Sequence, residues 1–284
     1  GLAYADGRGV AQDMVEAVKW WRKAADQGLD QAQSNLGLCY ATGSGVAKDE
    51  VEAMKWLRKA AEQGEVTAQS NLGECYALGR GVAQNMVEAV KWFRKGADQG
   101  NASAQFNLGV CYFNGTGVAQ DMVEAVQWFR KSAEQGDASA QSSLGACYAN
   151  GKGVEKDMAE AVKWYRKAAD QGDASAQFKI GNSYFVAKDH GEAVKWYRKA
   201  ADQGDAQAQS NLAVCYFKGL GVTQDVVEAY AYFNLASSTD EDARNKRGML
   251  EKRMSQDDVL RGQKRAMELQ KEIEAKIAAK KAGK

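Results

Sequence analysis

The residues with the clearest potential for chemistry are seven pairs in which Asp or Asn is followed three residues later by Glu. The pairs are Asp13 and Glu16, Asp49 and Glu52, Asn85 and Glu88, Asp121 and Glu124, Asp157 and Glu160, Asp189 and Glu192, and Asp225 and Glu228. Two neighbouring carboxylates could divide the acid and base roles of a catalytic step. The same spacing at a helix start forms a capping box, in which the first side chain accepts from an orphan backbone N–H and Glu reaches back to the cap residue. Because the pair recurs regularly at expected helix starts, we interpret it as structural.

The other residues that could take part in chemistry are a histidine and recurring glycines, and neither forms a recognised functional motif. His190 is the only histidine and directly follows Asp189, so we expect a surface or capping role, since a catalytic histidine needs partners. Paired glycines recur in a G-x-G-V turn, in Gly43–Val46, Gly79–Val82, Gly115–Val118, Gly151–Val154 and Gly219–Val222. No Lys-Ser/Thr follows these turns and no strand precedes them, which excludes a phosphate-binding loop. The sequence therefore predicts no catalytic, cofactor-binding or metal-binding residues.

The five cysteines also follow a pattern. They occupy one recurring position, at Cys39, Cys75, Cys111, Cys147 and Cys215, with Ser183 in the remaining place. Equivalent residues on stacked helices lie about 8–10 Å apart, whereas a disulfide needs Cα atoms within about 7 Å. We therefore interpret these residues as buried thiols. Reduced cysteines favour a reducing compartment. The sequence does not decide whether the protein is cytoplasmic or bacterial periplasmic or secreted.

Composition narrows the classes of partner. The 284 residues carry 38 basic and 37 acidic side chains, a formal charge of +1, which argues against a dedicated nucleic-acid-binding protein. No run of about 18 apolar residues is present, so we expect no membrane span. The first residues match the middle of a repeat, so we expect the chain to start inside a repeat, where no targeting segment is visible.

The element that must position all these residues is a repeat. Tryptophan recurs every 36 residues and then after 32, at Trp20, Trp56, Trp92, Trp128, Trp164 and Trp196, and Tyr232 takes the next place. A fixed period of this size predicts a stacked array of helix pairs. In one copy, residues 30–42 form helix A, whose apolar face holds Leu36 and Tyr40. Gly37 lies on that face, where its missing side chain should let the partner helix approach closely.

Helix B of the same copy follows the pair Asp49 and Glu52 and ends at Gly64. Its apolar stripe consists of Ala53, Trp56, Leu57 and Ala60. Its off-stripe basic residues are Lys55, Arg58 and Lys59. We interpret these basic residues as a solvated face that forms ion pairs between repeats, each contributing little stability. A basic stripe for an anionic partner is the alternative, which the interleaved acidic residues weaken.

Two segments depart from the pattern. The repeat in residues 173–204 lacks four residues of its turn and has no G-x-G-V. After residue 237 we expect one helix over 240–254 and a second from Ser255 to about Ala279. The second helix carries a narrow apolar stripe at Ala266, Leu269, Ile273 and Ile277. Its first half should cover the edge of the last repeat, and its end, KIAAKKAGK, should fray.

The motifs A-x-x-x-L-G-x-x-Y, G-x-G-V-x-x-D, E-A-x-x-W and K-A-A-x-Q-G resemble the Sel1-like repeat, a bacterial-type relative of the tetratricopeptide repeat. The resemblance covers a partial repeat at 1–28 and six repeats at 29–64, 65–100, 101–136, 137–172, 173–204 and 205–237, followed by capping helices and a charged tail at 238–284. It implies an all-α, right-handed superhelical solenoid whose A helices line the concave side. It also implies a protein-interaction scaffold rather than an enzyme, without cofactors.

Cysteine-rich relatives have been linked to β-lactam binding or hydrolysis, but they carry paired cysteines in each repeat, whereas this chain has one. An activity of that kind is one alternative. A self-assembling structural solenoid is another, and we expect a monomer or weak self-association.

Residues that differ between repeats are the candidates for a binding site. We expect the groove over residues 103–218 to bind a partner protein or peptide, with apolar anchoring on phenylalanines. The predicted groove residues are Glu74, Phe106, Val110, Phe113, Phe178, Asn182, Phe185, Asn211, Val214 and Phe217. The alternative is that these phenylalanines only fill gaps between A helices.

Overall fold

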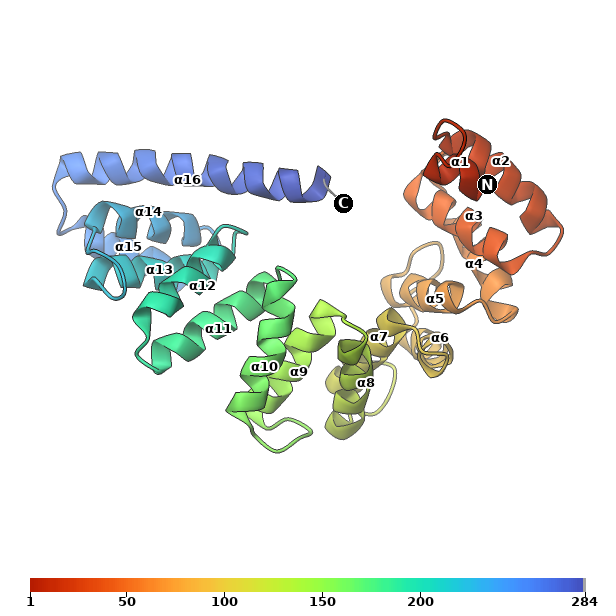
Figure 1. Cartoon of the computed structure of the whole chain (residues 1–284), viewed down its shortest axis with the longest axis horizontal. Coiled ribbons are helices and arrows are strands. Elements are labelled where there is room, and N and C mark those ends of the chain that lie inside the picture. The colour runs from red at the N-terminus through yellow and green to blue at the C-terminus, as the bar shows by residue number, and fades with distance from the viewer. Residues whose placement is uncertain (283–284) are drawn as a thin grey trace. The chain divides into compact units, whose positions relative to one another are not determined.

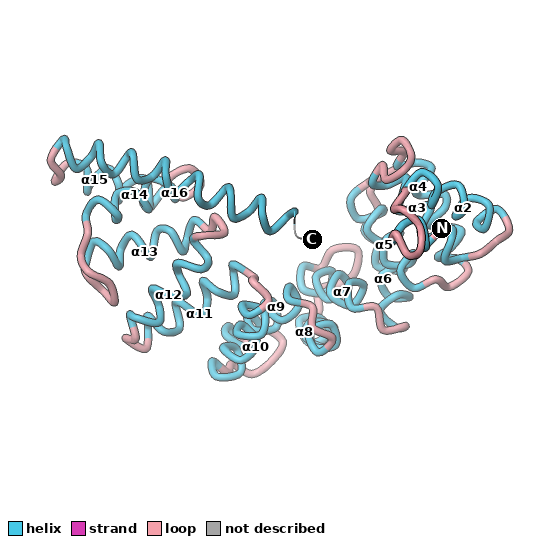
Figure 2. Tube along the Cα trace, turned by 45° about the horizontal axis from the view of Figure 1, so that its top comes forward, coloured by secondary structure: helices cyan, strands magenta, loops and turns pink. Residues whose placement is uncertain are grey.

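A computed structural model describes residues 1–282, which form sixteen α-helices and no strand (Figures 1 and 2). The helices are α1 (Leu2–Asp6), α2 (Met14–Asp26), α3 (Asp30–Thr42), α4 (Glu50–Glu62), α5 (Val66–Leu78), α6 (Met86–Asp98), α7 (Ala102–Asn114), α8 (Met122–Glu134), α9 (Ala138–Asn150), α10 (Met158–Asp170), α11 (Ala174–Val186), α12 (His190–Ala201), α13 (Ala206–Lys218), α14 (Val226–Ala236), α15 (Glu241–Glu251) and α16 (Gln256–Ala282). The predicted all-α array of helix pairs is confirmed. Among residues 1–282, no helix combines the length and hydropathy that crossing a bilayer requires.

The chain forms two compact units. One contains Gly1–Ala140 and Asn150–Lys156, and the other contains Gln141–Ala149 and Asp157–Lys284. The first unit has two apolar cores, one around α2–α4 and one around α4–α8, while the second has a core that runs from α11 to α16. Each core is built from neighbouring helix pairs, because a single pair cannot bury its own apolar face.

The glycine on the inner face of each A helix has the packing role predicted for it. A Cβ added to Gly37 of α3 would lie 2.7 Å from Cγ of Leu57 on α4, and one added to Gly109 of α7 would lie 2.7 Å from Cδ1 of Phe129 on α8. Side chains do not tolerate such distances, so only glycine allows helix B to approach this closely. The loss of helix propensity at glycine, about 1 kcal/mol, is thus offset by packing.

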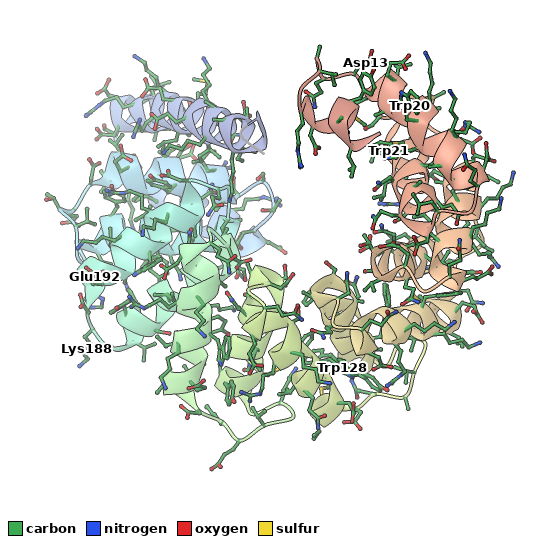
Figure 3. All side chains as sticks on the ribbon, turned by 45° about the vertical axis from the view of Figure 1, so that its right-hand side comes forward. Asp13, Trp20, Trp21, Trp128, Lys188 and Glu192 are labelled. Atoms are coloured by element: carbon green, nitrogen blue, oxygen red, sulfur yellow. The ribbon has the colours of Figure 1, made fainter. Side chains whose placement is uncertain are left out.

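The shortened repeat forms the turn between its two helices with a different residue at positive φ. In the regular repeats a glycine in the left-handed region, such as Gly43 with φ of 78°, ends helix A. Between α11 and α12 the residue with positive φ is Lys188, at 64°, the only non-glycine residue with positive φ in the part of the chain described. Figure 3 shows Lys188 beside the start of α12, where Glu192 follows in the first turn. A lysine therefore adopts a conformation that the longer repeats assign to glycine.

The caps are confirmed, but the role predicted for their glutamates is wrong. Asp49 Oδ1 accepts from the backbone N–H groups of Val51 and Glu52, at 3.0 and 2.9 Å, and Figure 3 labels the equivalent Asp13 at the start of α2. The backbone N–H of Asp49 already donates to the carbonyl of Tyr40, at 3.0 Å. Glu52 therefore has no cap donor left to satisfy, and its carboxylate accepts from Lys55 at 3.0 Å and from Trp56 Nε1 at 2.9 Å.

The predicted ion pairs between repeats are wrong as well. Lys55 pairs with Glu52 of its own helix, and Lys59 Nζ lies 4.3 Å from the ring centroid of Trp56. Arg58 instead contacts the next repeat, where its Nη2 donates to the hydroxyl of Tyr76 at 2.5 Å. The planar guanidinium of Arg58 reaches the tyrosine of the following A helix. The link between repeats is therefore an arginine–tyrosine contact.

Glutamines that sequence reasoning did not single out form a second polar network, which joins helix A to the preceding repeat and to helix B of its own repeat. Buried Gln33 of α3 donates to the carbonyl of Ala25 at 3.1 Å and accepts from Gln63 Nε2 at 2.7 Å. The same pairing joins Gln99 to Gln69, Gln135 to Gln105, Gln171 to Gln141 and Gln203 to Gln177. The signal was present in the sequence, because Gln33 and its equivalents on helix A and Gln63 and its equivalents at the end of helix B recur with the tryptophan period.

The C-terminal helices cover the last repeat. The views of Figures 1 and 2 show α16 running along α14, and Ala266, Leu269 and Ile273 of α16 are buried, as predicted. The expectation that the end of α16 frays is wrong up to Lys280. Lys276 pairs with Asp202 at 2.8 Å, and Lys280 Nζ donates to the carbonyl of Gly172 at 3.2 Å. These cations are held by the turns that end α10 and α12; the last two residues of the chain lie outside the described part.

Candidate functional site

The chemistry considered for the acidic pairs and the cysteines finds no support in their surroundings. Each cap carboxylate accepts from backbone N–H groups at the start of its helix. All five cysteines are buried, and none of them forms a disulfide. Burial raises the pKa of the thiols of Cys39, Cys75, Cys111 and Cys215, so they stay protonated at neutral pH and lack the thiolate that a nucleophile requires. Among residues 1–282, no group of three or more His, Cys, Asp and Glu side chains is arranged to hold a metal.

His190 is the first residue of α12 and is half-buried. Its ring centroid lies 4.8 Å from that of Phe185. No acidic side chain or nucleophile of the described residues is hydrogen-bonded to it. The histidine packs against the end of helix A in the shortened repeat.

In the first unit, the predicted groove residues lie on α5 and α7. Phe106 and Phe113 flank Phe129 of α8, with ring centroids 5.8 and 6.2 Å from it. Both phenylalanines are half-buried, as is Val110 between them. Phe129 is the buried ring that fills the space over Gly109. The two phenylalanines therefore pack by one side on helix B and expose the other side to solvent.

Glu74 of α5 lies next to this surface. Its Oε1 accepts from Asn107 Nδ2 of α7 at 3.4 Å, a long hydrogen bond between neighbouring A helices. Lys152 Nζ lies 5.1 Å from the ring centroid of Phe113. The surface of α7 thus combines a half-exposed apolar row with one acidic and one basic side chain at its edges. We call Phe106, Val110 and Phe113 the α7 face.

In the second unit, the same arrangement recurs on α11. Phe178 and Phe185 flank Tyr197 of α12, at 6.0 and 6.4 Å between centroids. Phe178 is only 7% exposed and belongs to the core, whereas Phe185 is half-buried. Of this pair, only Phe185 is open to a ligand.

Asn182 and Asn211 form a polar link between α11 and α13. Asn182 Oδ1 accepts from the hydroxyl of Tyr197 at 2.7 Å and from Asn211 Nδ2 at 3.0 Å. Burial raises the pKa of Tyr197 to about 12, so its hydroxyl keeps the donated proton at neutral pH. The two asparagines are therefore already engaged with each other and with helix B.

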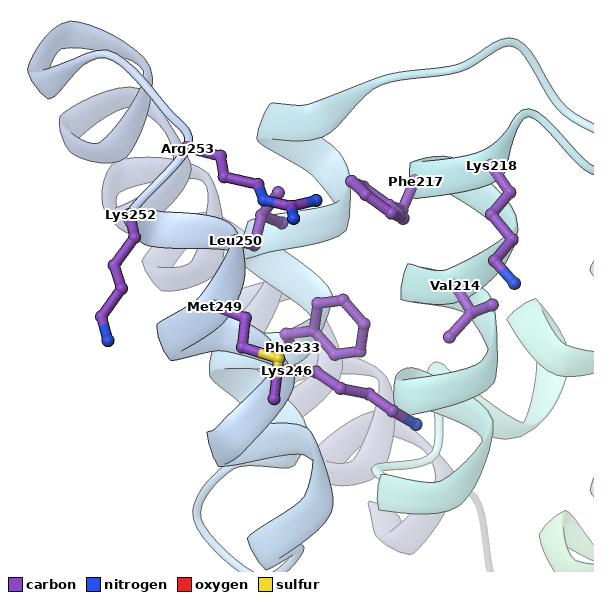
Figure 4. A pocket seen from close by; sticks show the side chains of 9 residues that line it. All are labelled: Val214, Phe217, Lys218, Phe233, Lys246, Met249, Leu250, Lys252 and Arg253. Atoms are coloured by element: carbon purple, nitrogen blue, oxygen red, sulfur yellow. The ribbon is translucent and has the colours of Figure 1, made fainter.

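Val214 and Phe217, the last predicted groove residues, line a cavity of about 550 Å³ (Figure 4). Its other apolar walls are Phe233 of α14 and Met249 and Leu250 of α15. The remaining lining residues are basic, and they are Lys218, Lys246, Lys252 and Arg253. We call this space the α13–α15 cavity. The residues from α15 were not predicted, because the sequence shows only a charged helix at that point.

The fold defines the class of this protein as an α-solenoid of helix pairs with half-exposed apolar residues on its A helices. Sel1 repeats match at residues 1–29, 30–65, 66–101, 102–137, 138–173, 174–205 and 206–238. The chain belongs to the Sel1 repeat family, as its motifs predicted. No curated protein matches the chain significantly.

Solved structures agree with this assignment. A Sel1 repeat protein from Oxalobacter formigenes is 35% identical, with 88% of this chain and 73% of that one covered and a TM-score of 0.72. A protective antigen of uropathogenic Escherichia coli strains, which displays an SLR fold, is 28% identical over 98% of this chain and 84% of its own, with a TM-score of 0.54. The APC/C hetero-tetramer Cut9–Hcn1 is 13% identical, covering 87% of this chain and 47% of that one, with a TM-score of 0.57, and shares the fold alone.

Proposed function

We propose that this chain is a non-catalytic interaction module that binds a segment of a partner protein on the exposed faces of its A helices. Repeats of the Sel1 and tetratricopeptide type commonly mediate protein interactions. The binding surfaces proposed are the α7 face in the first unit, and Phe185, Val214 and Phe217 in the second.

The observation that carries this proposal is a difference in burial along α7, which recurs at particular positions of α11 and α13. Positions common to the repeats are fully buried, as at Leu72 and Leu108, each 0% exposed. The α7 face, Phe185, Val214 and Phe217 lie at positions that vary between repeats, and these apolar side chains are half-exposed. Aromatic side chains that present one side to solvent from a rigid support can anchor a partner at low cost in conformational entropy.

The arrangement supports a binding role for phenylalanines that also pack. Phe106, Phe113 and Phe185 each rest on an aromatic ring of helix B, 5.8–6.4 Å away, so their positions are set before a ligand arrives. A preorganised anchor loses little freedom on binding. Packing against helix B and contact with a partner are therefore compatible roles for the same side chain.

The test begins with peptides selected from a random displayed library on the intact chain. Their affinities are then measured by fluorescence polarisation for Val110→Lys, Phe113→Ala and Phe185→Ala. We expect at least one variant to weaken each selected peptide about tenfold or more, the loss typical of a central anchor. Val110→Lys tests binding most directly, because it leaves the packing of the phenylalanines on Phe129 intact.

Val123→Lys is the matched control, since Val123 is 56% exposed but lies at the start of the B helix α8. Circular dichroism and thermal unfolding of every variant separate a loss of binding from a loss of fold. Unchanged affinity of every selected peptide for all three variants would contradict the proposal.

A further inference from the structure

The α13–α15 cavity is built as a binding site rather than as a gap between helices. Its volume of about 550 Å³ lies within the range of about 300–1,000 Å³ that is usual for ligand pockets. Phe233 and Leu250 at its floor are buried, and Phe217 and Val214 form one wall. Met249 on the facing wall is 66% exposed, so it leaves an apolar side chain accessible at the mouth.

The facing wall is held in place by polar contacts between α15 and the end of α14. Arg247 Nη1 donates to Asn234 Oδ1 at 2.6 Å and to Ser237 Oγ at 3.2 Å. Arg244 donates through Nε and Nη2 to the carbonyl of Ser237, at 3.2 and 2.9 Å. Two arginines thus fix α15 against α14, so the cavity is present before any ligand binds.

The mouth of the cavity carries positive charge only. Four of its nine lining residues are basic and none is acidic, although the whole chain is balanced at +1. In Figure 4 the side chains of Lys218, Lys246 and Arg253 lie around Phe217, Phe233 and Val214, while Lys252 points away from them. Lys246 pairs with Asp242 at 2.5 Å, but Lys218 and Arg253 form no ion pair with any of residues 1–282. The cavity therefore combines an apolar floor with uncompensated cations.

This combination selects the chemistry of the occupant. An apolar group is needed to fill the floor, and anionic groups on both sides of it are needed to reach cations on α13 and α15. A small dicarboxylate would leave the floor unfilled, and a fatty acid would bring a single charge. A peptide segment with a large apolar side chain between acidic residues satisfies both requirements.

We propose that the α13–α15 cavity docks an acidic segment of a partner protein. One large apolar side chain of that segment is buried between Phe217 and Phe233, and its carboxylates face Lys218 of α13 and Arg253 after α15. The inference rests on the proposed function for the class of ligand, a protein segment, but it uses a separate surface from the α7 face. Exposed cations act mainly on association rate and specificity, so the binding is expected to weaken with salt.

The experiment uses a panel of short synthetic peptides in which phenylalanine, leucine or tryptophan is flanked by glutamates, and the same panel with glutamines. Binding to the full chain is measured by fluorescence polarisation at low and high salt. We expect acidic peptides to bind at least tenfold more tightly than their glutamine counterparts, with affinity falling as salt rises. The double variant Lys218→Glu/Arg253→Glu should lose at least tenfold, and Met249→Ala several-fold.

The matched control is Lys264→Glu/Lys271→Glu, which changes the net charge equally at two exposed lysines of α16 and should leave the affinity unchanged. Equal binding of the acidic and glutamine panels would overturn the inference. So would binding of decanoate, but not of the acidic panel, in competition with a solvatochromic dye, because that outcome assigns the cavity to a small amphiphile. Val110→Lys, Phe113→Ala and Phe185→Ala together distinguish the two proposals. A chain whose library-selected peptides ignore all three of these variants, but whose acidic panel responds to Lys218→Glu/Arg253→Glu, contradicts only the proposed binding at the α7 face and Phe185. The reverse result contradicts this inference alone.

Discussion

The regular repeats and the C-terminal helices bury their residues in different ways. The A helix α3 buries seven of its residues, whereas α15, which begins where the period would place another A helix, buries only Ala243 and Leu250. Inside the repeats the inner apolar positions, such as Leu36 of α3, are buried in a core formed by neighbouring helices of the same pattern. α15 is held instead by two arginines on the end of α14, and a cavity remains beside it. The repeats thus hold their helices mainly by apolar packing, whereas α15 is held largely by hydrogen bonds.

Truncation of an apolar side chain should separate the two regions most strongly. Leu72→Ala on α5 removes a side chain that is fully buried, and we expect a loss of about 2–5 kcal/mol in the free energy of unfolding. Met249→Ala on α15 removes a largely exposed one, and we expect a change within about 0.5 kcal/mol. Urea denaturation followed by circular dichroism measures both. Losses of equal size would show that α15 is packed as tightly as a repeat.

Glycine replacement tests the same difference with a single methyl group. A Cβ on Gly109 would lie 2.7 Å from Phe129 and 3.2 Å from the carbonyl oxygen of Ala125, while one on Gly248 of α15 would have no neighbour within 4 Å. We expect Gly109→Ala to destabilise the chain by about 1–3 kcal/mol through overpacking. Gly248→Ala should stabilise it by up to about 1 kcal/mol through helix propensity. Shifts of the thermal unfolding midpoint with the same sign in both variants would contradict this comparison.

A smaller effect is expected from pH at the caps. Asp205 caps α13 and accepts from the backbone N–H of Ala208 at 2.7 Å, and burial raises the pKa of its carboxyl. Because the folded state then holds the proton more tightly than the unfolded state, ionisation of Asp205 lowers stability as pH rises through its folded pKa. Asn101 caps α7 in the same way without charge, at 2.8 Å from Ala104 N.

We therefore expect Asp205→Asn to raise the stability at neutral pH by about a few tenths of a kcal/mol. The gain should disappear at a pH below 3.8, the ordinary pKa of aspartic acid, where both states of Asp205 are protonated. Thermal unfolding of the two proteins across this range measures the difference. A gain that grows on acidification would contradict the assigned direction of the pKa shift.

Much of the repeat architecture could be predicted because its signals are local. The spacing of Trp20, Trp56 and their equivalents defines the period, and an Asp or Asn three residues before Glu marks the start of each B helix. Gly37 and its equivalents on the inner face of helix A indicate close approach of helix B. Each signal depends on neighbouring residues of the same repeat, so the structure reproduces it.

Contacts between helices were predicted less well. The glutamates of the caps were expected to reach back to the cap residue, but the carbonyl of Tyr40 occupies that donor and leaves Glu52 to Lys55 and Trp56. Lys280 was expected to lie in a frayed end, but the carbonyl of Gly172, more than a hundred residues earlier, accepts from it. Such partners are distant in sequence, and no periodicity points to them.

The candidate sites show the same difference between features set by neighbouring residues and features set by contacts distant in sequence. The sequence by itself determined the Sel1 repeat family, the helix pairs and the positions that vary between repeats, because side-chain size and helix capping act within one or two turns. The tertiary structure decided that Phe178 is buried while Phe185 stays half-exposed, and that Val214 and Phe217 face Met249 and Leu250 across a cavity. Exposure and cavity shape depend on how helices from different repeats meet. That information resides in the packing of whole helices and not in any single stretch of sequence.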